Sequence, residues 1–229
     1  MGFLQAVCFM NELHKEYSLK ELNTFGLDIK AARFCSIPDV PSLVALLEME
    51  EIRELPKLFL GEGSNMLFTG HFEGLVVHPA FKGIELLEDD GEQLLVRVGA
   101  GENWDQWVMH ATREGWFGLE NLSLIPGSVG AAPIQNIGAY GVELKDRFAW
   151  LEAWDLQKDQ VVKLDSKACR FGYRNSLFKQ EGRGRYIITH VTFRLSKTPK
   201  LMLDYGQVRK AFTDAGGKTP WDLRNIIIH

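Results

Sequence analysis

The sequence has few cysteines, no excess of positive charge and no long apolar run. Its three cysteines, Cys8, Cys35 and Cys169, form no CxxC pair. This spacing argues against a disulfide framework or a structural zinc site and favours a reducing, cytoplasmic compartment. The net charge of −4 at pH 7 gives no basic surface for nucleic acid. The apolar runs, such as 43–47 and 75–77, are far too short to span a membrane.

The first residues also lack a targeting signal. The stretch MGFLQAVCFM has neither the basic start nor the cleavage site of a signal peptide, and Ala6 stands where myristoylation needs Ser or Thr. The composition is 45% hydrophobic and 24% charged over 229 residues. These values are typical of a soluble globular protein with one large domain or two modest ones.

The apolar pattern predicts two clear helices among many strands. One begins near Asp39, with Leu43, Leu46 and Leu47 on one face. The other runs from Asn103 to Gly115, and its apolar face comprises Trp104, Trp107, Val108 and Ala111. Strands are expected at 57–61, 75–79, 83–88, 93–99, 147–156, 160–165 and 185–195, with a hairpin turn at 157–159. Because strands and helices do not alternate strictly, the expected class is α+β.

The last residues, TPWDLRNIIIH, have the pattern of a helix start. Thr219 can cap the helix, Pro220 suits its first position, and Asp222 completes a capping box. The apolar face would comprise Leu223, Ile226 and Ile227. Two interpretations stay open: a short terminal helix docked on the body, or a sequence that ends before its fold does.

A first candidate site is the glycine loop LGEGSNMLF, which follows a predicted strand. Gly61 and Gly63 allow close approach of the backbone, and the N–H groups around Ser64 and Asn65 can form an anion-binding nest. The alternative is a plain β-turn. The loop is not a GxGxxG fingerprint and does not support a Rossmann fold.

A second candidate is LIPGSVGAAPIQNIGAYG, residues 124–141. It has no charged residue and is too rich in Gly and Pro for a regular helix or strand. Small side chains on an irregular path suit a flat ligand lying against backbone, with Gln135 and Asn136 supplying amide hydrogen bonds. The alternative is a structural loop, but structureless loops of this length are uncommon unless they are functional.

A third candidate is CRFGYRNSLFK, residues 169–179. Arg170 and Arg174 flank an aromatic pair and could clamp a carboxylate or phosphate. The alternative is two surface arginines beside packed aromatics. No Ser/His/Asp arrangement or metal-ligand spacing is found, and His78 and His190 fit core or sheet-edge positions better than metal ligands.

Taken together, these segments resemble the UDP-N-acetylenolpyruvoylglucosamine reductase (UDP-N-acetylmuramate dehydrogenase) family. The matching stretches follow the family's order from residue 19 to 229. They are NTFGLD, LGEGSNMLF, VGAGENWDQWV, GLENLSLIPGSVGAAPIQNIGAYGVEL and CRFGYRNSLFK. The residues before position 19 fall outside the resemblance and could be an extension or a misassigned start, with Met10 as an alternative first residue.

The resemblance implies a two-subdomain FAD-binding fold of the vanillyl-alcohol-oxidase (PCMH) type. We expect an extension at 1–18, one FAD-binding subdomain at 19–75, a second at 76–215, and the start of a truncated third domain at 216–229. The family's proton-donating serine lies in a GNAGSFFKNP-like motif that this sequence lacks. The resemblance therefore implies that the third, substrate-binding domain is missing.

The resemblance also assigns site residues and chemistry. Arg174 would be the catalytic residue. The residues expected to bind FAD are Gly61, Gly63, Ser64, Asn65, Gly101, Ile125, Pro126, Gly127, Gly130 and Ile134. Those expected on the substrate side are Tyr140, Tyr173, Arg174 and Tyr205. NADPH would reduce FAD, which in turn reduces the enolpyruvyl group of the nucleotide-sugar substrate for peptidoglycan synthesis.

Two other functions stay open. The chain could be an FAD-binding module with impaired catalysis, because it lacks the proton-donor motif. A less favoured alternative is an oxygen-using flavin oxidase of the same fold. The sequence does not indicate an oligomeric state.

Overall fold

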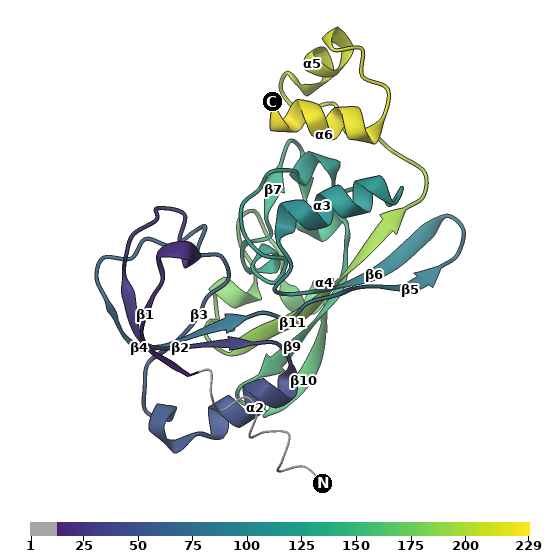
Figure 1. Cartoon of the computed structure of the whole chain (residues 1–229). Helices are drawn as coiled ribbons and strands as arrows, with labels where there is room; N and C mark the ends of the chain where they lie inside the picture. Colours follow the sequence, from purple (N-terminus) through teal and green to yellow (C-terminus); the bar gives the residue numbers. More distant parts are fainter. Residues whose placement is uncertain (1–12) are drawn as a thin grey trace. The chain divides into compact units, whose positions relative to one another are not determined.

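The computed structural model describes residues 13–229, which divide into two compact units with a boundary between Lys82 and Gly83 (Figure 1). Residue 75, the predicted end of the first subdomain, lies within β4 (Phe72–Pro79), which belongs to the first sheet. Residues 1–12, with the alternative start at Met10, lie outside the described part. Residues 14–18 of the expected extension form strand β1.

The first unit contains a four-stranded sheet in the order β1-β2-β4-β3. β1 pairs antiparallel with β2, whereas β4 pairs parallel with both β2 and β3. The bounds of the other elements of this unit are β2 (Lys30–Ile37), β3 (Lys57–Phe59), α2 (Val40–Glu48), η2 (Lys20–Leu22) and η3 (Glu50–Ile52). The sequence pattern predicted β3 and β4 but missed β1 and the central strand β2.

Helix α2 begins as the sequence predicted. The Asp39 carboxylate accepts a hydrogen bond from the Ser42 N–H at 2.8 Å, which satisfies one unpaired donor of the first turn. Leu43 and Leu46 are buried, and Leu47 is half-buried. One apolar cluster of this unit comprises Leu19, Ala31, Phe34, Leu60 and Val76.

The second unit contains a five-stranded antiparallel sheet in the order β10-β9-β11-β6-β5. The strands are β5 (Ile84–Asp89), β6 (Gln93–Gly99), β9 (Phe148–Asp155), β10 (Gln160–Asp165) and β11 (Tyr186–Ser196). All five lie where the sequence predicted strands, and β9 and β10 form the expected hairpin. The α+β class is confirmed.

Helix α3 (Trp104–Arg113) supplies the core of this unit. The Asn103 side chain caps it by accepting the Gln106 N–H at 3.0 Å. Trp104 and Trp107 are almost fully buried, and their rings lie 5.9 and 5.5 Å from the ring of Phe193 on β11. The predicted apolar face of this helix therefore packs on the sheet.

Short elements connect the sheet to the site. They are η4 (Glu120–Leu122), η5 (Ala132–Gln135), β7 (Gly138–Ala139), β8 (Val142–Glu143), η6 (Leu144–Asp146), α4 (Ser166–Cys169) and η7 (Leu177–Lys179). The composition of residues 124–141 predicts an irregular path. The structure differs, because η5 and β7 lie within this segment. Pro133 fits the start of η5 because its ring fixes φ and its missing N–H would have had no partner there.

Two helices, α5 (Val208–Asp214) and α6 (Pro220–Ile228), end the described chain and pack side by side (Figure 1). The capping box predicted for α6 is present, with Thr219 and Asp222 exchanging hydrogen bonds. Leu223 and Ile227 of α6 pack with Val208 and Phe212 of α5. α6 also contacts α3 and η4.

A buried ion pair between β9 and the start of β11 predicts a loss of stability in acid. Asp155 is almost fully buried, and Arg185 donates to its two carboxylate oxygens at 2.8 and 2.6 Å. These hydrogen bonds lower the pKa of Asp155 to about 2 from an ordinary value of 3.8. The stabilisation is therefore complete above about pH 4 and disappears as the pH falls through about 2.

We expect Asp155→Asn to lower the free energy of unfolding at neutral pH and to flatten its dependence between pH 4 and 2. Urea unfolding at a series of pH values measures both effects. The control Asp204→Asn breaks an exposed pair with Arg209, which should contribute less than about 1 kcal/mol. An unchanged pH profile in Asp155→Asn would contradict the assignment.

Candidate functional site

The first candidate loop leaves β3 and turns at once. The Leu60 N–H donates to the Val77 carbonyl at 2.9 Å, and the Met66 N–H donates to the Gly63 carbonyl at 3.3 Å. Gly63 has φ +62°, in the left-handed region that glycine adopts without a steric penalty. This backbone geometry suits an anion-binding nest, but the roles of Gly61, Gly63, Ser64 and Asn65 stay predictions.

The NTFGLD motif packs directly beneath this loop. A Cβ on Gly63 would lie 2.1 Å from the Leu22 carbonyl oxygen and 3.1 Å from the Asn23 Cα. Asn23 is buried; its Nδ2 donates to the carbonyls of Leu19 and Leu27 at 2.8 and 3.0 Å. NTFGLD therefore acts as a rigid support for the glycine loop. The sequence alone predicts no such role for it.

Apolar side chains are exposed beside these two segments. Phe25 is 66% exposed and Leu67 is 65% exposed, although side chains of this size are normally buried. They follow Asn23 and Gly63 closely in the sequence. The first unit thus offers glycine backbone and apolar surface together, which fits a ligand that carries both phosphates and flat rings.

In the second unit, the GAGEN turn and the PGSVG turn are joined by backbone hydrogen bonds. The Gly130 N–H donates to the Ala100 carbonyl, and the Trp104 N–H donates to the Gly127 carbonyl, both at 2.8 Å. A Cβ on Gly130 would lie 2.5 Å from the Ala100 Cβ, so only glycine allows this approach. The structure therefore brings together the segments that contain Gly101, Gly127 and Gly130.

The three residues that precede Gly127 are at least partly accessible. Leu124 is 55% exposed, Ile125 is half-buried and Pro126 is exposed. The Leu124 N–H donates to the Asp105 Oδ1 at 2.6 Å, which fixes the start of the segment on α3. Ile134, the last predicted member of this group, is half-buried in η5.

Two buried side chains attach FGYRNS to this loop. Asn136 is fully buried; its Nδ2 donates to the Gly172 carbonyl and its Oδ1 accepts the Lys145 N–H, each at 3.0 Å. Ser176 is 1% exposed and donates to the Ile134 carbonyl at 2.6 Å. The expectation that Asn136 supplies hydrogen bonds to a ligand is therefore wrong, because the protein itself uses both of its amide atoms.

Arg174 occupies the tip of a tight turn. Gly172 and Asn175 exchange backbone hydrogen bonds at 3.0 and 3.2 Å, which leaves Tyr173 and Arg174 as the two corner residues. Tyr173 is 84% exposed, and Arg174 is also exposed. Arg170, the other arginine of the expected clamp, instead pairs with Glu181. Arg174 is thus the better placed of the two to meet a ligand anion.

Backbone strain is concentrated in the same segments. The described chain has seven non-glycine residues with positive φ, and five of them lie in the predicted segments 124–141 and 169–179. They are Leu124, Asn136, Tyr140, Arg170 and Arg174. Such conformations cost roughly 1–2 kcal/mol each and persist where the surroundings enforce them, commonly at functional sites.

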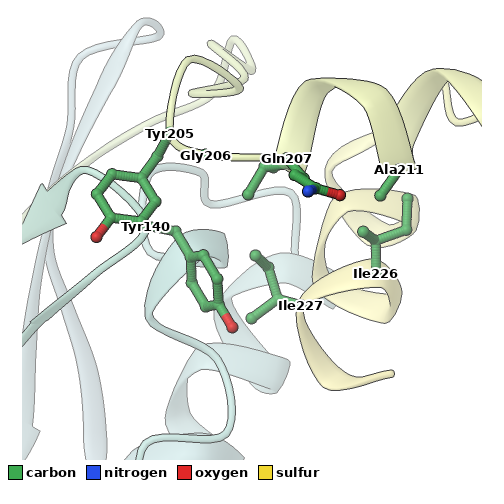
Figure 2. A pocket seen from close by; sticks show the side chains of 8 residues that line it. Tyr140, Tyr205, Gly206, Gln207, Ala211, Ile226 and Ile227 are labelled. Carbon is green, nitrogen blue, oxygen red and sulfur yellow. The ribbon is translucent and has the colours of Figure 1, made fainter.

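Tyr140 and Tyr205 line one pocket of about 230 Å³ with residues of α5 and α6 (Figure 2). The rings meet edge to face, with centroids 6.1 Å apart, and Ile227 and Gln207 lie close to them. Buried Asn121 supports this arrangement by donating to the Tyr140 carbonyl at 3.1 Å. The structure thus brings together two of the predicted substrate residues, whereas Tyr173 and Arg174 do not line this pocket.

Glu120, for which the sequence predicts no role, is a buried acid that precedes Asn121, the residue that supports Tyr140. Its carboxylate oxygens accept the Gly118 N–H, each at 3.0 Å, and Arg147 donates to the Gly118 carbonyl at 3.2 Å. Burial raises the pKa of Glu120 above its ordinary value. These contacts stabilise the turn that leads into η4.

Two kinds of feature are absent from residues 13–229. There, no three His, Cys, Asp or Glu side chains are grouped so that they could hold a metal ion. None of the helices in the same range is both long and apolar enough to cross a membrane.

Comparison with known proteins identifies a family and several relatives by sequence. The profile of the FAD binding domain family matches residues 34–165. A UDP-N-acetylenolpyruvoylglucosamine reductase from Chromobacterium violaceum is 45% identical over 220 residues, covering 95% of this chain and 64% of the relative. The reductase of the same name from Pseudomonas aeruginosa is 47% identical over 209 residues, covering 91% and 61%. The chain therefore spans somewhat less than two thirds of these relatives.

Solved structures agree with the fold. The crystal structure of a UDP-N-acetylenolpyruvylglucosamine reductase from Thermus caldophilus superposes with a TM-score of 0.64 and 27% identity, covering 80% of this chain and 62% of that one. A solvent-stable cholesterol oxidase has a TM-score of 0.59 at 15% identity, covering 81% and 38%, which is a likeness of fold alone. The expected flavin-binding fold class is confirmed.

The contact between Gly63 and NTFGLD can be tested with a matched pair of substitutions. Gly26 and Gly63 both have φ +62°, but a Cβ on Gly26 would meet nothing within 4 Å. We expect Gly26→Ala to cost about 1–2 kcal/mol of unfolding free energy from backbone strain alone. Gly63→Ala should cost about 1–3 kcal/mol more, because its Cβ would clash with backbone. Urea unfolding measures both, and equal losses would contradict the packing.

Proposed function

Because the chain belongs to the FAD binding domain family, we propose that its glycine loops bind FAD. In the first unit, the proposed contacts to the pyrophosphate are Gly61, Gly63, Ser64 and Asn65. In the second unit, the proposed contacts to the flavin are Gly101, Ile125, Pro126, Gly127, Gly130 and Ile134. The single strongest support is the pair of turns at 100–104 and 127–130, whose backbone is fixed by hydrogen bonds while Ile125 and Pro126 stay accessible.

We propose further that the whole protein reduces UDP-N-acetylglucosamine enolpyruvate to UDP-N-acetylmuramate, with NADPH as reductant, in cytoplasmic peptidoglycan synthesis. The names of the relatives support this reaction. Bound FAD would supply hydride chemistry. That hydride would be delivered to the enolpyruvyl β-carbon, negative charge would develop on the α-carbon and carboxylate, and a general acid or water would donate the proton to the α-carbon.

Arg174 is proposed as the residue that stabilises this charge. Its guanidinium can bind the enolpyruvyl carboxylate, and a fixed cation lowers the free energy of the negative charge that develops there. Its position depends on the turn that Asn136 and Ser176 attach to the second loop. Because these two anchors are buried, the backbone of the turn that carries Arg174 is held in place.

Tyr140, Tyr173 and Tyr205 are proposed to contact the nucleotide sugar. Tyr140 and Tyr205 already form an edge-to-face pair beside an apolar pocket, which suits stacking with a flat ring. Tyr173 neighbours Arg174 at the exposed turn and would contact the substrate near the reacting group.

A second candidate function is an FAD-binding module that does not complete the reaction. It is favoured by the family match, because the matched region, residues 34–165, contains both glycine loops but not Arg174. NADPH oxidation that depends on the enolpyruvyl substrate separates the two. The reductase predicts such turnover, whereas the module predicts FAD binding without it.

We expect Arg174→Gln to leave FAD affinity unchanged and to weaken binding of the enolpyruvyl substrate. Difference spectra of the bound flavin measure the substrate binding. If the wild-type protein reduces the enolpyruvyl substrate, the kcat of Arg174→Gln should be lower on the order of 100–1000-fold. Arg170→Gln is the matched control, since this neighbouring arginine pairs with Glu181 and should leave both values nearly unchanged. Equal effects of the two substitutions would contradict the role of Arg174.

A further inference from the structure

An ion pair joins α6 to α3 beneath the second candidate loop. The Arg224 guanidinium donates from Nη1 and Nη2 to the Asp105 Oδ1 and Oδ2 at 2.7 and 2.8 Å. Arg224 is 3% exposed, although arginine is almost never fully buried unless it is paired. A bidentate pair of this kind fixes both the distance and the orientation between the two helices.

The same carboxylate also holds the loop. The Asp105 Oδ1 that accepts from Arg224 accepts the Leu124 N–H at 2.6 Å. One residue earlier on α3, the Trp104 N–H donates to the Gly127 carbonyl at 2.8 Å. Residues 125–126 are thus suspended between two hydrogen bonds to consecutive residues of α3.

The position of Leu124 makes the first of these bonds important. Its φ of +60° is a conformation that leucine rarely adopts, because the left-handed region has a steric cost for a residue with a Cβ. A charge-assisted hydrogen bond to a carboxylate is strong enough to offset such a cost. Without the fixed carboxylate, we expect Leu124 to relax toward negative φ and to carry the neighbouring Ile125 and Pro126 with it.

We propose that Arg224 is a positioning residue for the cofactor: through Asp105 it holds Ile125 and Pro126 in place, so that docking of α6 and binding of FAD favour each other. This inference rests on the proposed function, in which Ile125 and Pro126 contact the flavin. It also gives α6, which lies outside the matched FAD binding domain region 34–165, a role in cofactor binding.

Thermodynamic linkage makes the coupling reciprocal. If docked α6 raises the affinity for FAD by some factor, bound FAD must stabilise the docked helix by the same factor. The backbone amides of α6 should therefore exchange with deuterium more slowly when FAD is bound, even though α6 need not touch the cofactor. A residue that only anchors α6 would not produce this effect.

The chain offers a matched control on the same two helices. Arg113 of α3 lies over the ring of Trp221 on α6, 5.3 Å from its centroid. Arg113→Gln removes a contact between α3 and α6 but leaves Asp105 and Leu124 untouched. Arg224→Gln removes the ion pair that reaches the loop.

The test measures FAD affinity and hydrogen–deuterium exchange on the full chain. We expect Arg224→Gln to weaken FAD binding on the order of 5–150-fold, the usual range of such couplings. Peptides spanning 122–127 should exchange faster even without FAD, and FAD should no longer protect α6. Arg113→Gln should keep the wild-type FAD affinity within about twofold, together with the protection of α6 by FAD.

Other outcomes overturn the inference. Wild-type FAD affinity in Arg224→Gln, or wild-type α6 without protection by FAD, contradicts it and leaves the proposed function intact. Failure of the wild-type chain to bind FAD overturns the proposed function together with this coupling. If Arg224→Gln does not fold, Arg224→Lys keeps the charge but loses the bidentate geometry, and an unchanged FAD affinity in that variant would also contradict the inference.

Discussion

The candidate site depends on one constraint, which is that glycine-rich backbone without regular structure must still have its buried polar groups satisfied. Side chains that are themselves buried or fixed meet this requirement. They are Asn23 in the first unit and Asn121, Asn136, Ser176 and Asp105 in the second. Asn23 joins the backbone of Leu19 and Leu27 within its own turn, and the other four side chains donate to or accept from backbone of another segment. These segments are therefore held in place without a helix or sheet. Removing any of these side chains would leave the backbone groups that they bind without that partner.

This constraint explains why separate motifs of the sequence act together. Asn136 and Ser176 tie the turn of Arg174 to the second glycine loop, while Asn121 ties Tyr140 to the segment that precedes Tyr205. Within the second unit, the residues proposed to meet the flavin and the substrate therefore share one rigid framework. The strained backbone of Arg174 and Tyr140 is the cost of presenting these side chains outward.

Local patterns in the sequence predicted much of this fold. Asn103 and Thr219 identified the starts of α3 and α6, and apolar runs identified all five strands of the second sheet. Long-range pairs could not be predicted, because nothing near Asp105 indicates that Arg224 will meet it. Asn136 was misjudged for a related reason: an amide in a glycine loop can serve a ligand or the protein, and only the tertiary contacts decide which. Strand β2 was missed because Lys30 and Arg33 interrupt its apolar pattern.

The central claim is that both glycine loops bind FAD, and hydrogen–deuterium exchange of the wild-type chain with and without FAD tests it most directly. The account predicts slower exchange on FAD binding at 61–65, 100–104 and 124–134, since these backbone segments would contact the cofactor. FAD binding that leaves either residues 61–65 or the two second-unit segments, 100–104 and 124–134, unprotected would contradict the account.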